Sequence, residues 1–206
     1  MTIDFYTWTT PNGRKVSIAL EELRLDYATH PVNITKDEQF APDFLKISPN
    51  NKIPAVVDPQ GPDGEPISVF ETGAILLYLA DKTGQLMPDE PRARNAAMQW
   101  LMWQMGGFGP MLGQAHHFRR FAPEKLPYAV DRYSNEARRL YGVLDKRLEE
   151  VEYLAGDYSV ADIATFPWAA RHEWQGIALE DFPNVKRWYD AIWARPAVEK
   201  GMAVPG

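Results

Sequence analysis

Apolar positions before Gly84 switch between strand-like and helix-like spacing. Ile3 to Trp8 is rich in aromatic and β-branched side chains, which predicts a first, buried strand. Apolar side chains then recur at helical spacing from Pro11 to Leu23, which predicts a helix. Thr10 is placed to be its N-cap, and Pro11 stands at the favoured first helical position.

Further segments complete this part of the chain. The pattern predicts a weaker strand at 27–32, a short helix at 40–47, strands at 55–57 and 67–70, and a strongly apolar helix at 72–82. The strand-helix-strand part requires a right-handed crossover between parallel strands, and the later hairpin adds antiparallel ones. The order therefore predicts a mixed four-stranded sheet covered by helices.

The composition changes after Gly84, and no strand pattern follows. We divide the chain into a first domain at 1–82, a linker at 83–92 rich in proline and acidic residues, and an all-helical domain at 93–206. Helices are predicted at 94–105, 127–152 and 185–195, the last ended by Pro196. Glycines at 106–109 should kink or interrupt the chain after the first of these, and Ser159 with Asp162 fits a variant capping box.

Composition and charge set limits on function. The 206 residues carry 22 basic and 28 acidic side chains, and the net charge of −6 argues against bulk binding to nucleic acid or to an anionic membrane. We find no apolar run of membrane-spanning length and no secretory signal, so we expect a cytoplasmic protein. The absence of cysteine excludes a protein thiol nucleophile, and the four histidines lack metal-site spacing, so we expect no metal.

The stretch from Ser48 to Asp58 stands out because a polar loop runs through Pro54 directly into a β-branched strand. Proline is the residue that most readily follows a cis peptide bond. A cis Ile53–Pro54 bond would turn the backbone of Ile53 outward, where an extended peptide ligand could pair with it. A plain connection with a trans proline fits the same residues.

Three strings together resemble the glutathione transferases, and specifically their nu-class, or disulfide-bond oxidoreductase, branch. They are SPNNKIPA at 48–55, FETGAILLYLA at 70–80 and WLMWQMGGFGPMLGQ at 100–114. The resemblance covers essentially the whole chain. It implies an α/β N-terminal thioredoxin-like domain of order βαβαββα, a cis Ile53–Pro54 bond, and an all-α C-terminal domain.

The resemblance also implies that glutathione is the bound substrate. Glu71 and Thr72 start a helix, whose free N–H groups and dipole attract a carboxylate, while Glu71 faces the ligand's ammonium. Ile53 is implied as the backbone partner of the ligand's cysteine unit, and Lys52 as the partner of its glycyl carboxylate. From composition alone these residues would be a helix cap and a solvated loop.

Gln39 and Arg132 match family positions that contact glutathione, although each is an ordinary surface residue by composition. Thr10 and Asn12 match the residues near the ligand sulfur, and we expect them to stabilise the thiolate. Their structural alternatives are an N-cap and a residue of the first helical turn. Tyr6 is a minor alternative to Thr10, because tyrosine on the first strand serves in other classes.

Three functions are compatible with this site. The leading one is a glutathione-dependent thiol–disulfide oxidoreductase in which ligand and substrate supply every sulfur. The second is conjugation of glutathione to an electrophile, in an apolar pocket whose residues could equally form core: Trp103, Phe108, Met111 and Phe118. The third is a non-catalytic glutathione-binding or regulatory module. Family members are usually twofold dimers, so we expect a homodimer.

Overall fold

The computed structural model describes residues 2–206, which form two compact units. Residues 2–87 and 195–206 make up the first unit, and residues 88–194 make up the second. The first unit contains a four-stranded sheet and its helices. Its elements are β1 (Ile3–Thr7), α1 (Pro11–Glu22), β2 (Tyr27–Pro31), η1 (Ile34–Lys36), η2 (Glu38–Phe40), α2 (Pro42–Ile47), β3 (Ala55–Asp58), β4 (Ile67–Phe70), α3 (Thr72–Thr83) and α10 (Pro196–Ala203).

The sheet has the strand order β2-β1-β3-β4, and it is mixed as the sequence predicts. β1 runs parallel to β2, with Phe5 opposite Thr29, because the intervening α1 carries the chain back along the sheet. β1 is antiparallel to β3, and β3 is antiparallel to β4. Phe5 and Val56 are fully buried at the centre of these pairs.

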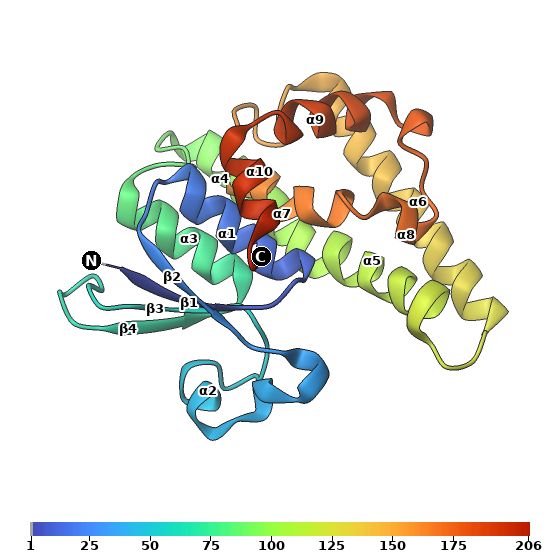
Figure 1. Ribbon diagram of the computed structural model, residues 1–206. Coiled ribbons are helices and arrows are strands. Elements are labelled where there is room, and N and C mark those ends of the chain that lie inside the picture. The colour runs from blue at the N-terminus through green and yellow to red at the C-terminus, as the bar shows by residue number, and fades with distance from the viewer. Residues whose placement is uncertain (1) are drawn as a thin grey trace. The chain divides into compact units, whose positions relative to one another are not determined.

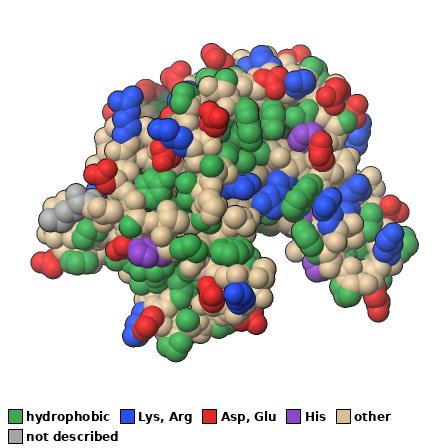
Figure 2. Space-filling model, in the orientation of Figure 1, with side chains coloured by type: hydrophobic (Ala, Val, Ile, Leu, Met, Phe, Trp, Pro, Cys, Tyr) green, Lys and Arg blue, Asp and Glu red, His purple; other side chains and the backbone are tan. Residues whose placement is uncertain are grey.

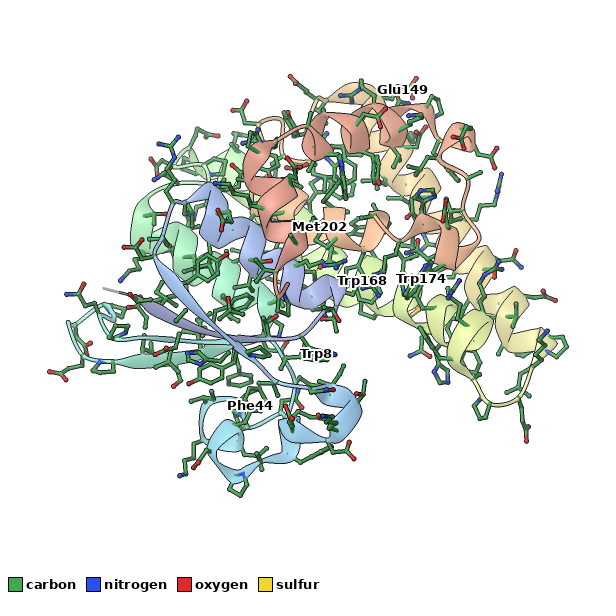
Figure 3. All side chains as sticks on the ribbon, in the orientation of Figure 1. Trp8, Phe44, Glu149, Trp168, Trp174 and Met202 are labelled. Carbon is green, nitrogen blue, oxygen red and sulfur yellow. The ribbon has the colours of Figure 1, made fainter. Side chains whose placement is uncertain are left out.

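Helices lie on both faces of the sheet. Figure 1 shows α1 and α3 together on one face and α2 on the opposite side. On the α2 side, Phe44 points from its helix toward the sheet (Figure 3) and forms a small core with Val32 and Ala55. Tyr6 packs against this core and stacks on His30, with 4.8 Å between ring centroids.

The last helix, α10, belongs to the first unit. Ser17 Oγ of α1 donates a hydrogen bond of 2.6 Å to the carbonyl of Gly201. A Cβ at Gly201 would lie 2.6 Å from Ile18 Cα, so only glycine permits this close approach. The division expected from the sequence, at 1–82, 83–92 and 93–206, differs from the observed units at this point. It assigns residues 195–206 to the helical domain, whereas they belong to the first unit.

The second unit is helical. Its elements are α4 (Pro91–Trp103), η3 (Gln104–Phe108), α5 (Gly109–His116), η4 (His117–Phe121), α6 (Pro127–Glu150), α7 (Val160–Ala169), α8 (His172–Gln175), η5 (Leu179–Asp181) and α9 (Pro183–Trp193). η3 and η4 are single wide turns of π-helix that continue their neighbours. The predicted interruption after Met105 is therefore a local widening near the glycines, and helix resumes at Gly109.

One apolar face of α6 supplies much of the second unit's core. Leu140, Tyr141 and Leu144 are at most 2% exposed, and they follow the helical spacing seen in the sequence. The predicted capping box is present at the start of α7. The Asp162 carboxylate accepts a hydrogen bond from the Ser159 N–H, and the Ser159 side chain accepts one from the backbone of the first helical turn. Figure 2 shows hydrophobic side chains gathered on the surface between α7 and α9.

Two sequence predictions need correction. The helix predicted at 185–195 ends at Trp193, before Pro196 as expected. It is not the last helix, because Pro196 begins α10, where proline is favoured at the first position. The strand ending near Val32 stops at Pro31, and the Val32 side chain enters the small core. Among residues 2–206, no helix has both the length and the apolar character needed to cross a membrane.

Candidate functional site

Strand pairing brings most of the predicted site residues to one edge of the sheet. Tyr6 on β1 is paired with Ala55 on β3, which is paired with Phe70 on β4. Because both pairs are antiparallel, the chain after β1, before β3 and after β4 leaves the sheet at the same edge. The predicted sulfur, backbone and helix-start contacts follow at these three exits.

Thr10 is the N-cap of α1, and its Oγ1 accepts a hydrogen bond of 3.1 Å from the Gly13 N–H. The structural alternative from the sequence is therefore present. The cap does not conflict with a role of Thr10 in stabilising a thiolate. The cap uses a lone pair of the hydroxyl oxygen, and the hydroxyl proton remains available to be donated. The half-buried Thr10 side chain can thus cap the helix and donate to a ligand sulfur at once.

Gly13 fixes the tight turn between β1 and α1. A Cβ at this position would meet the Thr7 hydroxyl and would lie 2.6 Å from the Trp8 carbonyl oxygen. Trp8, labelled in Figure 3, precedes the cap, and its carbonyl accepts the Thr10 N–H at 2.7 Å. The glycine therefore lets Thr10 and the half-buried Asn12 sit at the strand exit.

The loop from Ser48 to Lys52 is held by its own hydrogen bonds. Ser48 is fully buried, and its Oγ donates to the Lys52 carbonyl at 2.8 Å. The Asn51 N–H donates to the Ser48 carbonyl at 2.9 Å, and Asn51 has the left-handed φ of 49° that asparagine tolerates. These bonds leave the Lys52 side chain exposed to solvent.

The Ile53–Pro54 bond is cis, which confirms the prediction that the resemblance implies. Pro54 is buried and β3 begins one residue later. Within residues 2–206, we find no hydrogen bond to the backbone N–H or C=O of Ile53. The main chain of Ile53 is thus able to accept a peptide partner.

Glu71 stands immediately before α3 in an unusual backbone conformation. Its φ is 68° and its ψ is 121°, a combination that costs a residue with a side chain about 1–3 kcal/mol. The exposed carboxylate accepts a hydrogen bond of 3.3 Å from Asn50 Nδ2, which links the 48–52 loop to the start of α3. Strain of this kind concentrates at functional sites, which supports a ligand contact at Glu71.

Thr72 is the first residue of α3, and its side chain is 4% exposed. Helix α3 spans 12 residues, and the N–H groups of its first turn lack partners within the helix. The positive end of the helix dipole lies at the same place. A carboxylate is therefore favoured beside Thr72, next to the acidic side chain of Glu71.

Gln39 lies on η2, in the segment that follows β2. β2 is parallel to β1, so this segment also begins at the edge where Thr10 lies. The Gln39 Oε1 atom is buried and has no hydrogen-bond partner among residues 2–206. A buried acceptor without a donor is uncommon, and a ligand N–H would satisfy it.

Arg132 belongs to the second unit, on α6, and is exposed. It lines a hollow of about 400 Å³ together with Met111, Tyr133 and three polar side chains of α6. Its charge, after that of Arg139, helps to lower the pKa of Glu136. The structure thus gives Arg132 a polar, open setting within its own unit.

Lys15 is a residue to which the sequence pattern assigned no role. It lies on α1 and is 1% exposed. Burial lowers its pKa to about 7, and the charge of Glu71 acts in the opposite direction. The burial of Lys15 could have been predicted from its spacing. Lys15 precedes Ile18 and Ala19 by three and four positions, so it lies on the same apolar face of the helix.

Two further candidates, Tyr6 and Phe108, pack in the cores of their units. Tyr6 packs against the small core, and burial, aided by Asp4, raises the pKa of its phenol. Phe108 is fully buried against Tyr141, as the core interpretation predicts. Among residues 2–206, no three metal-ligating side chains lie close enough together to hold an ion.

Comparisons with known proteins agree with this geometry. Residues 9–82 match the model for the glutathione S-transferase N-terminal domain, and residues 105–196 match that for the C-terminal domain. The disulfide-bond oxidoreductase YfcG of Escherichia coli is 54% identical over 97% of this chain and 94% of its own length.

Solved structures are equally similar. A glutathione transferase from Burkholderia graminis, with two glutathione molecules bound per subunit, is 50% identical with a TM-score of 0.94, covering 99% of this chain and 88% of that one. A glutathione transferase from Pseudomonas putida, with one glutathione disulfide per subunit, is 45% identical with a TM-score of 0.94, covering 100% of this chain and 92% of that one.

Proposed function

Because the chain belongs to the glutathione S-transferase family, we propose that it is a glutathione-dependent thiol–disulfide oxidoreductase that acts through bound glutathione. The observation that carries the proposal is the near full-length similarity to a protein named disulfide-bond oxidoreductase in a chain without cysteine. A reaction on disulfides then has to take every sulfur from ligand and substrate.

In the proposed complex, glutathione lies extended along the strand exits. The backbone of Ile53 pairs with its cysteine unit, which adds the ligand to the sheet edge. Thr72 and the first turn of α3 receive the γ-glutamyl carboxylate, and Glu71 receives the adjacent ammonium. Lys52 faces the glycyl carboxylate.

Gln39 and Arg132 complete the proposed set of contacts. The unpartnered Oε1 of Gln39 would accept a ligand N–H, which removes the cost of a buried acceptor without a donor. Arg132 would supply positive charge toward a ligand carboxylate, in keeping with its exposed position on α6.

Thr10 and Asn12 are proposed to stabilise the glutathione thiolate. A free thiol has a pKa near ~8.5, and a change of one in pKa corresponds to about 1.36 kcal/mol. A hydrogen bond to a charged group contributes roughly 1.5–3 kcal/mol, and a helix N-terminus about 0.3–1. The Thr10 hydroxyl and the start of α1 are therefore sufficient to lower the thiol pKa by about one to two, without a protein base.

The proposed reaction is thiol–disulfide exchange. The bound thiolate attacks one sulfur of the substrate disulfide, a glutathione–substrate disulfide forms, and the other substrate sulfur leaves as a thiolate that takes up a proton. A second glutathione thiolate then attacks the mixed disulfide at the glutathione sulfur. The products are glutathione disulfide and a second substrate thiol, so two glutathiones are oxidised for each disulfide reduced.

Purified protein tests the proposal with hydroxyethyl disulfide and glutathione. We expect reduction at a rate well above the uncatalysed exchange. A chlorinated aromatic electrophile provides the comparison. Conjugation without disulfide reduction would favour the transferase alternative, whereas binding of glutathione without either reaction would favour a non-catalytic module.

We further propose a cytoplasmic homodimer. Net disulfide reduction by glutathione requires a reduced glutathione pool, and cytosolic pools are more reducing than that of the endoplasmic reticulum. Three large apolar side chains between η4 and the start of α6 are exposed, and they are suited to a partner subunit: Phe121, Leu126 and Tyr128. Light scattering on the purified protein measures the oligomeric state.

A further inference from the structure

A fully buried lysine lies on α1, the helix that Thr10 caps. Lys15 is one helical turn beyond Asn12 on α1 and is 1% exposed. Lysine is almost never buried to this extent unless its charge is used by a partner. Its neighbours Val16 and Ile18 are fully buried apolar side chains, so packing alone would be satisfied by an apolar residue at position 15.

The direction of the Lys15 side chain follows from the two helices that pack on α1. Figure 1 shows α1 between α3 and α10. Ser17 contacts α10 through the 2.6 Å bond to the Gly201 carbonyl. Lys15 is two residues earlier, about 200° around the helix from Ser17, so it does not share that contact. The charge that acts on Lys15 is that of Glu71, at the start of α3.

Two unfavourable features therefore meet between α1 and α3. One is a buried lysine side chain, and the other is Glu71, the residue before α3, held at a φ of 68°. The charge of Glu71 favours the ionised form of Lys15, against the effect of burial. Costly features of this kind persist where the surrounding structure uses them.

We propose that Lys15 is a positioning residue of the glutathione site, whose buried side chain holds the Glu71 carboxylate in place for the ligand's ammonium. The inference rests on the proposed function, in which Glu71 faces that ammonium. It assigns Lys15 no contact with the reacting sulfur. Its effect should therefore appear in glutathione binding and not in the chemical step.

Calorimetry with two ligands tests the proposal. The first ligand is glutathione, and the second is glutaryl-cysteinyl-glycine, in which hydrogen replaces the ammonium. Lys15→Met removes the charge while keeping a long apolar side chain, and Lys46→Met on α2 is the control, because Lys46 is exposed and paired with Asp43. We expect Lys15→Met to raise the Kd for glutathione about five- to tenfold and to leave that for the analogue within about twofold.

A double variant separates positioning from general structure. In the Glu71→Gln background, Lys15→Met should produce no further loss of glutathione affinity, because the group that it positions is gone. The KM for glutathione should rise in Lys15→Met with little change in kcat. The thermal midpoint should be unchanged or higher, because replacing a buried charge by an apolar side chain often stabilises a protein.

Several results would overturn the proposal. One is an equal loss of affinity for both ligands in Lys15→Met, and another is unchanged or tighter glutathione binding in that variant. A third is an undiminished effect of Lys15→Met on glutathione affinity in the Glu71→Gln background. If Lys15→Met does not fold, Lys15→Gln carries the same comparison, and failure of both to fold would show a structural role instead.

Failure of the proposed function looks different. In that case the unmodified protein and Lys46→Met would themselves fail to bind glutathione. Glutathione binding by these two proteins, with unchanged discrimination between the ligands in Lys15→Met, would reject the role of Lys15 alone.

Discussion

Asn50 donates a hydrogen bond of 3.3 Å to the carboxylate of Glu71, and this bond joins the loop before β3 to the residue before α3. The two residues are 21 positions apart in sequence, and the hairpin of β3 and β4 brings them together. The cis Ile53–Pro54 bond lies between them along the chain. The proposed contacts to the centre and to one end of glutathione are therefore parts of one local structure.

Glu71→Gln should weaken glutathione binding strongly. The change keeps the shape and the bond to Asn50 but removes the charge that faces the ligand ammonium. A hydrogen bond to a charged group contributes roughly 1.5–3 kcal/mol, so the KM for glutathione should rise about 10- to 150-fold with a smaller effect on kcat. Steady-state kinetics with hydroxyethyl disulfide measures this. Glu65→Gln, at an exposed turn of the same unit, is the control, and equal KM values for the two variants would contradict the assignment.

Substitutions at Thr10 should separate its two roles. Thr10→Ala loses the cap, which costs about 1 kcal/mol of stability, and loses the hydroxyl. Thr10→Asp keeps a good cap but places an anion where a donor stood, so stability should be retained while disulfide reduction falls at least about tenfold. Thr10→Ser should retain both. Chemical denaturation and activity measurements test the set, and an active Thr10→Asp protein would leave the hydroxyl without a role.

Gly13→Ala should disrupt the turn between β1 and α1. Its Cβ would press on the Thr7 hydroxyl and the Trp8 carbonyl, and forced contacts of this kind cost typically about 1–3 kcal/mol. Gly142→Ala is a matched control on α6, because a Cβ there meets no atom within 4 Å and alanine favours the helix by about 1 kcal/mol. The first variant should be less stable and less active, and the second should be more stable. Equal stabilities would show that the turn tolerates a side chain.

His116 should make the stability of the protein depend on pH. Burial, with the nearby charge of Arg171, lowers its pKa to about 4 from 6.5. Gln175 Nε2 lies 3.0 Å from His116 Nε2, which is consistent with a neutral ring that accepts this bond. Between these pH values the unfolded chain binds more protons than the folded one, so this contribution is complete above 6.5 and is lost as the pH falls toward 4.

The comparison of His116→Gln with the unmodified protein isolates this effect. Burial raises the pKa of Asp162 to about 6, which gives a contribution of opposite sign, and it cancels in the difference. The difference in unfolding free energy should grow by on the order of 3 kcal/mol from pH 4 to 6.5 and stay constant above. Denaturant titrations at several pH values measure it, with exposed His117→Gln as the control. Parallel curves for the two proteins would be the contrary result.

Much of the first unit was predictable because its elements carry strong local signals. β-branched and aromatic runs mark β1 and β3, and Thr10 with Pro11 marks the start of α1. The capping box at Ser159 was equally clear, since its two side chains and their spacing identify the start of α7. These features depend on contacts within a few residues, which the sequence contains directly.

Other features depend on contacts that the sequence does not display. A proline such as Pro196 is compatible both with the end of one helix and with the start of the next. The contact that stabilises α10 is made with Ile18, far away along the chain. The hydrogen bond between Asn50 and Glu71 depends on the β3–β4 hairpin. The roles of Gln39 and Arg132 had no local signal, because only a ligand distinguishes them from other surface residues.

The return of α10 to α1 has a consequence for biosynthesis. A ribosome releases residues 88–194, the whole second unit, before it releases Gly201, which the first unit needs against Ile18. N-terminal units usually fold first during synthesis. Here the first unit can be completed only after the whole second unit has been synthesised. The sheet can assemble early, but the face of α1 that packs on α10 stays uncovered until residues 196–203 emerge. An open reading frame truncated before codon 196 would leave that face uncovered permanently.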